Sequence, residues 1–282
     1  MNCNEKMPLI DQEVKLPDFT GGRLSPTQIT MYLRCPLQYF HRYVRGSKEP
    51  PGVALIEGSA HHASLEMNNK HKVNTKEDLP VKLVVEKFED DFNTKKKDIG
   101  DWEKETTESV ISRGRGILKV YFSEFAPKLQ PELVEHEFIL NIGSVPVLGY
   151  MDVAGKVENN KNVAVDYKVV SRAKTQAEIL GDIQLGFYGW GLKKKLLFED
   201  SSTDNNLPVF SGFCMLKKTK RPEVEWSCCK ITNNRLLWLR QLVLHVAHSI
   251  QKGSFPPCDP TSWACSSKFC GYYKECRGKF DV

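Results

Sequence analysis

The pattern of hydrophobic and polar positions along this chain first changes its period near Pro131. Upstream, over about residues 75–126, apolar positions recur at helical spacing, as expected for helices that bury one face. The clearest stripe consists of Leu118, Tyr121, Phe122 and Phe125. From Pro131 the period becomes two, which predicts three successive strands over 132–142, 145–157 and 162–170.

The remainder of the chain alternates between the two kinds of element. A helix is predicted from about Thr175 to Lys195, two further strands over 209–218 and 223–231, and a strongly apolar helix over 235–250. Residues 252–282 form a tail rich in Cys, Gly, Pro and Ser. This order predicts an α/β fold in which a small mixed sheet is flanked by helices, with helical material from both ends of the chain packed against it.

Two helix starts stand out in the N-terminal part. Ser25 can cap a helix whose first position is Pro26, and Pro36 then breaks or restarts that helix, which leaves Cys35 at the junction. A second helix is predicted to begin near Gly58. It places His62 and Glu66, four residues apart, on one face.

Composition narrows the class of protein. A chain of 282 residues with 40% hydrophobic and 27% charged residues is typical of an ordinary globular protein, and its net charge of +5 permits a nucleic-acid partner without requiring one. The polar N-terminus resembles no signal peptide, and no window has the apolar length of a membrane span, so we expect a cytoplasmic (intracellular) protein with no membrane association. In a reducing compartment, nine cysteines favour metal binding over a disulfide framework.

The predicted strand 162–170 carries a candidate site. Alternation places Asp166 and Lys168 on one face of the strand and Tyr167 on the other. A second carboxylate, Asp152, ends the apolar run of the preceding strand. Two carboxylates and an amine can hold a hard divalent cation beside a reacting phosphate, although the same pattern is common on exposed strand faces.

The tail contains a second candidate. Cys265, Cys270 and Cys276 lie within twelve residues, in a segment too short and polar to form its own core. Thiolates at this spacing commonly hold zinc or an iron–sulfur cluster. The fourth ligand is either the nearby Cys258 or the distant Cys35.

Taken in order, these pieces resemble the PD-(D/E)xK nuclease superfamily, specifically its RecB-like and Cas4-like exonuclease branch. The resemblance spans roughly residues 24–276 and rests on five elements: a Cys-Pro pair near a capped helix, G-x-x-x-H-x-x-L-E, G-x-x-D, D-Y-K and Q-x-x-x-Y, followed by the cysteine tail. In this sequence they fall on Cys35, Gly58 to Glu66, Gly149 to Asp152, Asp166 to Lys168, and Gln184 with Tyr188. The resemblance implies a restriction-endonuclease-like core.

The resemblance also implies roles for these residues. His62, Asp152 and Asp166 would ligate Mn²⁺ or Mg²⁺ together with the Tyr167 carbonyl, and a histidine ligand favours Mn²⁺. Lys168 would orient or activate the attacking water and offset the charge that builds on the phosphate. Gln184 and Tyr188 would position the DNA strand and the active-site groups. Glu66 and Glu137 are further ligands or, as we favour, ordinary salt-bridge partners.

In the iron–sulfur members of this branch, one N-terminal cysteine joins three C-terminal ones. Here a 4Fe-4S cluster would be held by Cys35, Cys265, Cys270 and Cys276. This chain has four residues between Cys265 and Cys270, where Cas4-like proteins usually have two. Zinc, or no metal, therefore stays open, and Cys258 could replace Cys35.

The sequence thus predicts a metal-dependent DNA exonuclease that acts on single strands or DNA ends in recombination, repair or phage DNA processing. DNA contacts would draw on the basic runs 193–195 and 217–221, and the alternative for either run is a solubilising surface. No nucleotide-triphosphate site is recognisable, so a helicase or recombination motor would be a separate subunit. The alternative is a non-catalytic DNA-binding or adaptor subunit on an inactivated nuclease fold. The sequence leaves the oligomeric state open.

The predicted domain organisation has two parts. A flexible arm occupies residues 1–22, and a single nuclease domain occupies residues 23–282. Within that domain we expect a helical region over 23–130, a catalytic sheet core over 131–250 and a cysteine-rich metal-binding tail over 251–282.

Overall fold

The computed structural model describes residues 14–199 and 208–280. Contacts between residues sort the chain into two compact units, which are described separately. Unit 1 combines the N-terminal segment up to Glu49 with Ile139–Gly149 and the segment from Thr232 onward, and unit 2 comprises Pro50–Phe138 and Tyr150–Ile231. The single nuclease domain over 23–282 stays a prediction, and its predicted subdivisions do not coincide with these units.

Unit 2 is built on a mixed sheet of five strands in the order β1-β2-β3-β4-β5. β2 and β3 pair antiparallel, β3 and β4 pair parallel, and β4 and β5 pair antiparallel. The last residues of β1 and the first residues of β2, within Ile139–Gly149, belong to unit 1. The strands are β1 (Leu129–Ile142), β2 (Val145–Val157), β3 (Asn160–Val170), β4 (Phe210–Lys217) and β5 (Glu223–Lys230).

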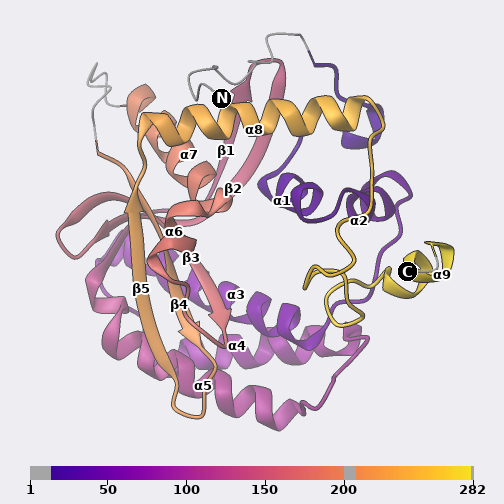
Figure 1. The fold of residues 1–282 in the computed structure, drawn as a ribbon. Helices are drawn as coiled ribbons and strands as arrows, with labels where there is room; N and C mark the ends of the chain where they lie inside the picture. The colour runs from indigo at the N-terminus through magenta and orange to yellow at the C-terminus, as the bar shows by residue number, and fades with distance from the viewer. Residues whose placement is uncertain (1–13, 200–207, 281–282) are drawn as a thin grey trace. The chain divides into compact units, whose positions relative to one another are not determined.

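Helices cover the sheet of unit 2. α3 (Val53–Thr75), α4 (Val81–Lys95) and α5 (Thr107–Glu124) pack side by side (Figure 1). α3 contacts β3, and α5 contacts β5. Their apolar faces form one core with alternate residues of β3, namely Val163, Val165 and Tyr167. α6 (Gln176–Gly181) contacts β5, and α7 (Ile183–Glu199) contacts β3 and β4.

The predicted fold class is confirmed. The expected strands all form within a few residues of their predicted bounds, and helices flank the mixed sheet. The helix predicted from Thr175 to Lys195 is instead two helices that break at Asp182, whose backbone is extended and whose carboxylate accepts a hydrogen bond from the Leu185 N–H at the start of α7. No helix among the residues that the structure describes is both long and apolar enough to cross a bilayer.

Unit 1 joins the two ends of the chain. Ser25 accepts a hydrogen bond from the Gln28 N–H and caps α1 (Pro26–Arg34), and α2 (Pro36–Tyr39) restarts at Pro36 as predicted. A short π-helical turn, η2 (Phe40–Val44), follows. From the other end come α8 (Asn233–Gln251), which contacts α1, and α9 (Tyr273–Phe280).

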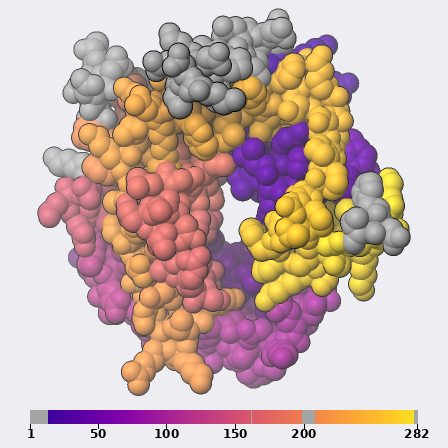
Figure 2. Space-filling view, viewed as in Figure 1, coloured from indigo at the N-terminus to yellow at the C-terminus, as the bar shows by residue number. Residues whose placement is uncertain are grey.

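The C-terminal segment packs on these N-terminal helices, as the yellow and indigo residues of Figure 2 show. The Tyr32 hydroxyl donates to the Ser254 carbonyl at 2.6 Å, and the Tyr272 hydroxyl donates to the Ser47 carbonyl at 2.6 Å. The ring of Tyr272 also stacks on that of His41, with 5.0 Å between centroids. A polar, proline-rich tail thereby gains a fixed path although it forms little regular structure.

The end of the predicted N-terminal arm is anchored within unit 1. The Val14 side chain is buried, and the Val14 N–H donates to the Ser144 Oγ at 2.9 Å. A single 3₁₀ turn, η1 (Asp18–Thr20), precedes Gly21. The rest of the arm, residues 1–13, lies outside the described residues, and the arm's flexibility stays a prediction.

Candidate functional site

The strand β3 presents its two faces to different surroundings, as alternation predicts. Tyr167 points into the core, where its hydroxyl accepts a hydrogen bond from the Asn69 amide at 2.9 Å and lies 3.0 Å from the Tyr121 hydroxyl. Asp166 and Lys168 point to the opposite face, towards α7. The buried tyrosine fixes the strand, and with it the backbone carbonyl and the two charged side chains beside it.

Asp166 and Lys168 form an ion pair that Gln184 completes. The Lys168 amine lies 2.8 Å from Asp166 Oδ2, and the Asp166 side chain is only 1% exposed. The Gln184 amide donates to Asp166 Oδ1 at 2.7 Å and to the Tyr188 hydroxyl at 3.0 Å, while its carbonyl accepts from the Lys168 amine at 3.1 Å. Burial alone would lower the pKa of the Lys168 amine, but the Asp166 carboxylate outweighs it and the pKa is raised, so the amine stays protonated.

A second group of ligand atoms lies around the Tyr167 peptide, next to this ion pair. One atom each from His62, Glu135 and Asp152 lie within 4.8 Å of one another. His62 Nδ1 is 3.3 Å from Asp152 Oδ2, and His62 Nε2 is 2.9 Å from the Tyr167 carbonyl oxygen. Asp152 Oδ2 also accepts from the Tyr167 N–H at 2.9 Å. The structure therefore brings together all four residues predicted as metal ligands: His62, Asp152, Asp166 and Tyr167.

The electrostatics of this group favour a bound cation. Burial, followed by the neighbouring Asp166, raises the pKa of Asp152 to about 8, and burial, followed by Asp152, raises the pKa of Glu135 to about 7. Burial lowers the pKa of His62, which keeps its imidazole neutral and able to ligate. Crowded carboxylates beside a neutral imidazole repel one another without a cation and form a suitable donor set for Mn²⁺ or Mg²⁺ with one.

The sequence reasoning missed Glu135. It named Glu66 and Glu137 instead, and those carboxylates pair with the Lys70 amine at 2.5 Å and the Tyr150 hydroxyl at 2.6 Å. On a regular strand, Glu135 and Glu137 would lie on the same face, so the period of two cannot tell which of them is a ligand. The difference arises because Glu135 has a φ of 48°, which interrupts the regular extended backbone of β1.

Replacing Gln184 tests whether it positions the side chains of Asp166 and Lys168. The variant Gln184→Ala is expected to cleave substrate 10- to 100-fold more slowly, roughly the usual cost of removing a partner that orients a metal or catalytic group. The matched control is Gln176→Ala on α6, since Gln176 contacts Ser227 and Cys228 rather than the site. Single-turnover cleavage rates check this, and a Gln184→Ala rate equal to that of Gln176→Ala would contradict the assigned role.

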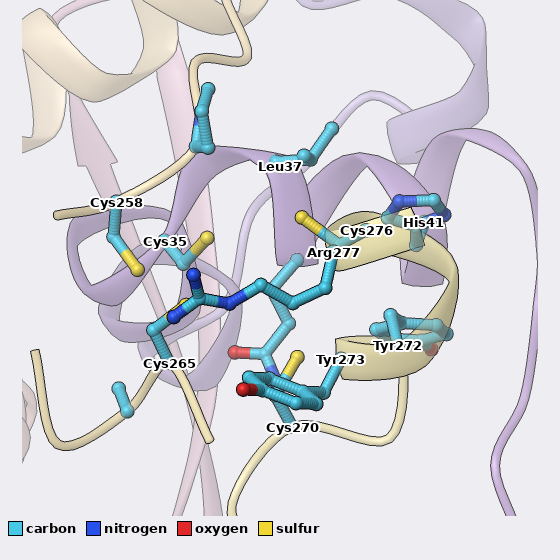
Figure 3. A pocket seen from close by; sticks show the side chains of 13 residues that line it. Cys35, Leu37, His41, Cys258, Cys265, Cys270, Tyr272, Tyr273, Cys276 and Arg277 are labelled. Atoms are coloured by element: carbon cyan, nitrogen blue, oxygen red, sulfur yellow. The ribbon is translucent and has the colours of Figure 1, made fainter. Parts of the chain in front are cut away.

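The predicted cysteines also meet, in unit 1. A cavity there is lined by five of them: Cys35 from the junction between α1 and α2, Cys276 from α9, and Cys258, Cys265 and Cys270 from the segment between α8 and α9 (Figure 3). Cys35 reaches this cavity because its backbone is extended between two short helices. Both candidates for the fourth ligand, Cys35 and Cys258, therefore line the cavity beside the three tail cysteines.

Arg277 shows what kind of group suits the cavity. Its guanidinium extends among the sulfurs in Figure 3, and its buried Nε–H has no hydrogen-bond partner. Burial, followed by the thiols of Cys35 and Cys265, raises the pKa of Cys258 to about 12. A buried donor without an acceptor suits an anionic group, and thiols that burial keeps protonated would have to lose their protons before a metal could bind.

Comparisons with known proteins agree with this geometry. The family model described as the PD-(D/E)XK nuclease superfamily matches residues 23–277. The crystal structure of a protein described as a "Putative exonuclease", from Eubacterium rectale, has a similar fold with a TM-score of 0.54 and 14% identity, over 92% of this chain and 93% of that one. No curated protein matches the chain. Because the family model covers far more than half of the sequence, the chain belongs to the PD-(D/E)XK nuclease superfamily, as its motifs predict.

Proposed function

We propose that this protein is a metal-dependent DNA exonuclease of the RecB-like and Cas4-like branch, acting on single strands or DNA ends. The observation that carries the proposal is the meeting of His62, Glu135 and Asp152 with the Asp166–Lys168 pair around one strand. A phosphodiester is an anion, so hydrolysis needs cations at the point of attack and an acidic cage to hold them. The E. rectale protein's description as an exonuclease accords with this proposal.

The residues of the site have two kinds of role: some bind the cation, and others orient the water and the catalytic groups. His62, Glu135, Asp152 and Asp166, with the Tyr167 carbonyl, would hold the cation, and the imidazole favours Mn²⁺ over Mg²⁺. When bound, the cation supplies positive charge that acidifies water and polarises the phosphate. The Lys168 amine orients the attacking water and offsets negative charge that develops on the phosphate. Gln184 holds the side chains of Asp166 and Lys168 in position by hydrogen bonds, and the Tyr188 hydroxyl accepts a further hydrogen bond from the Gln184 amide.

We further propose that the five-cysteine cavity of unit 1 holds a 4Fe-4S cluster on Cys35, Cys265, Cys270 and Cys276. What supports the proposal is that Cys35 lines the same cavity as the three tail cysteines. Thiolates from separate segments of a chain can each bind a different iron of such a cluster. Zinc is the alternative.

Part of the basic run 217–221 is already paired with acidic residues of the protein. In the turn that follows β4, the Lys217 amine is paired with Glu223 at 2.5 Å and with Glu225 at 3.3 Å. Lys218 lies 3.6 Å from the buried Glu57 carboxylate. Such pairs reduce the positive charge that these lysines offer to a phosphate backbone, so DNA binding requires other contacts as well.

Three labelled substrates incubated with purified protein test the proposed function: linear single strands, linear duplexes and single-stranded circles. We expect degradation of the linear single strands, intact circles, faster cleavage with Mn²⁺ than with Mg²⁺, and no cleavage by Asp166→Ala. Cleavage of circles at the same rate would identify an endonuclease. Failure of the wild type on every substrate and metal would support the alternative, a non-catalytic DNA-binding or adaptor subunit.

A further inference from the structure

Two large aromatic side chains stand exposed on the cysteine-rich segment of unit 1. Trp263 is 65% exposed and Phe269 is 50% exposed, and their rings meet edge to face with 5.2 Å between centroids. The Lys268 amine lies 5.6 Å from the centroid of the Phe269 ring. We call Trp263, Lys268 and Phe269 the aromatic platform. Leaving two such rings in water forgoes the free energy of burying them, so their exposure requires an explanation.

The platform is held by the loop that carries it. The N–H groups of Phe269 and Cys270 both donate to the Ser266 carbonyl, and the Ser266 hydroxyl donates to the Trp263 carbonyl at 3.1 Å. Cys265 and Cys270, which line the cavity, flank the loop. With the sulfurs directed inward, the loop presents its ring-bearing side to solvent in a defined arrangement rather than as a freely moving tail.

The charge around the platform selects an anionic partner. Within residues 259–280 the acidic side chains are already engaged, since Glu275 pairs with Arg45 at 2.5 Å and Asp259 accepts from the backbone and hydroxyl of Thr261. Lys268 is exposed next to the rings. The basic residues of this segment, without Arg277 in the cysteine cavity, still outnumber the two acidic ones and are Lys268, Lys274 and Lys279.

Exposed ring faces with a neighbouring cation suit unpaired nucleobases, which stack on aromatic side chains while phosphates meet the amines. A duplex hides its base faces and offers nothing to stack, and an apolar protein partner would gain nothing from the lysine. We propose that the aromatic platform binds single-stranded nucleic acid by stacking its bases on Trp263 and Phe269, with Lys268 at a phosphate. The choice of DNA over RNA rests on the proposed nuclease function.

Fluorescence anisotropy of labelled oligo(dT), in buffer without added divalent cation so that the strand stays intact, tests the platform. Trp263→Ala and Phe269→Ala are each expected to weaken binding about tenfold, within the range for one lost stacking contact. The slope of log affinity against log salt should stay unchanged in both. Lys268→Gln should instead reduce that slope by about 0.7, the value for one released phosphate contact on a single strand. Trp238→Ala, which removes a 48% exposed tryptophan from α8, is the control and should bind as wild type.

Cleavage of the dinucleotide pTpT separates this inference from the proposed function. It offers the candidate active site one phosphodiester and leaves no further nucleotide for the platform. We expect the wild type and Trp263→Ala to cleave it equally, whereas a wild type that binds oligo(dT) but cleaves nothing would refute only the nuclease assignment. Binding by Trp263→Ala equal to that of the wild type would overturn the platform. So would sedimentation showing that the variant loses self-association instead, because the rings would then cover a second copy of the chain.

Discussion

Replacing Asp152 by asparagine is expected to reduce DNA cleavage by about a thousandfold or more while preserving the fold. The Asp152 carboxylate is one of three ligand atoms within 4.8 Å of one another, and removing its charge weakens the hold on a divalent cation. Such a cation contributes several kcal/mol to transition-state stabilisation, and each 1.36 kcal/mol is tenfold in rate. The asparagine carbonyl can still accept the Tyr167 N–H that Asp152 accepts at 2.9 Å. Single-turnover rates at a Mn²⁺ concentration that only half-saturates the wild type measure the effect.

The same variant should behave differently in stability. The pKa of Asp152 is raised to about 8 in the folded protein, against a usual value of about 3.9. A raised pKa favours the folded state at low pH, and this contribution is lost as the pH rises from about 4 through 8. Without metal, the melting temperature of the wild type should therefore fall more between pH 6 and pH 9 than that of Asp152→Asn.

A matched control for Asp152→Asn lies on β1. Glu137→Gln removes an exposed carboxylate that contacts Tyr150 and should cleave DNA at close to the wild-type rate. If Asp152→Asn retains the rate of Glu137→Gln, the ligand assignment is wrong. If Asp152→Asn fails to fold, Glu135→Gln provides the same test at the neighbouring ligand.

Substitution of Cys265 by serine should produce the second large effect. We expect protein purified without oxygen to lose its visible absorption near 400 nm and to expose the segment from Lys252 onward to proteases. The free energy of binding a structural metal, of the order of 10 kcal/mol, also stabilises the folded state of the segment that holds it. Apart from its contacts with the N-terminal helices, the segment has little regular structure to stabilise it, because between α8 and α9 it contains turns rather than helices or strands. Absorption spectra, metal analysis and limited proteolysis measure the outcome.

Other cysteines provide controls and identify the fourth ligand. Cys228→Ser, on β5 in unit 2, should keep both the colour and the protease resistance. Cys35→Ser should lose the colour and Cys258→Ser should keep it. The reverse result would exchange the two cysteines' roles. A colourless wild type that contains zinc would replace the cluster by the alternative metal.

Much of the fold followed from periodicity. Alternation placed Asp166 and Lys168 on one strand face with Tyr167 in the core, and the proline after Cys35 marked the end of α1. Those predictions succeed because strand alternation and proline geometry depend on adjacent residues alone. The break at Asp182 was missed because its surroundings look helical on both sides.

The missing parts of the site depend on long-range structure. Glu135 joins His62 and Asp152 only because its own backbone leaves the regular strand conformation, which no local pattern signals. Arg277 looks like an ordinary surface residue in the sequence, yet its buried Nε lies in the cysteine cavity. The basic runs illustrate the converse, since charge along a sequence does not reveal which lysines already have acidic partners.

We propose above that the residues around β3 form a divalent-cation nuclease site. Its most direct test is the release of labelled nucleotides from linear single-stranded DNA, measured for the wild type and Asp166→Asn at increasing Mn²⁺ concentrations. We expect that release by the wild type rises with Mn²⁺ to saturation and is abolished by a chelator, and that the folded variant releases nothing. Release by Asp166→Asn at the wild-type rate, or release by the wild type that persists in the chelator, would contradict it.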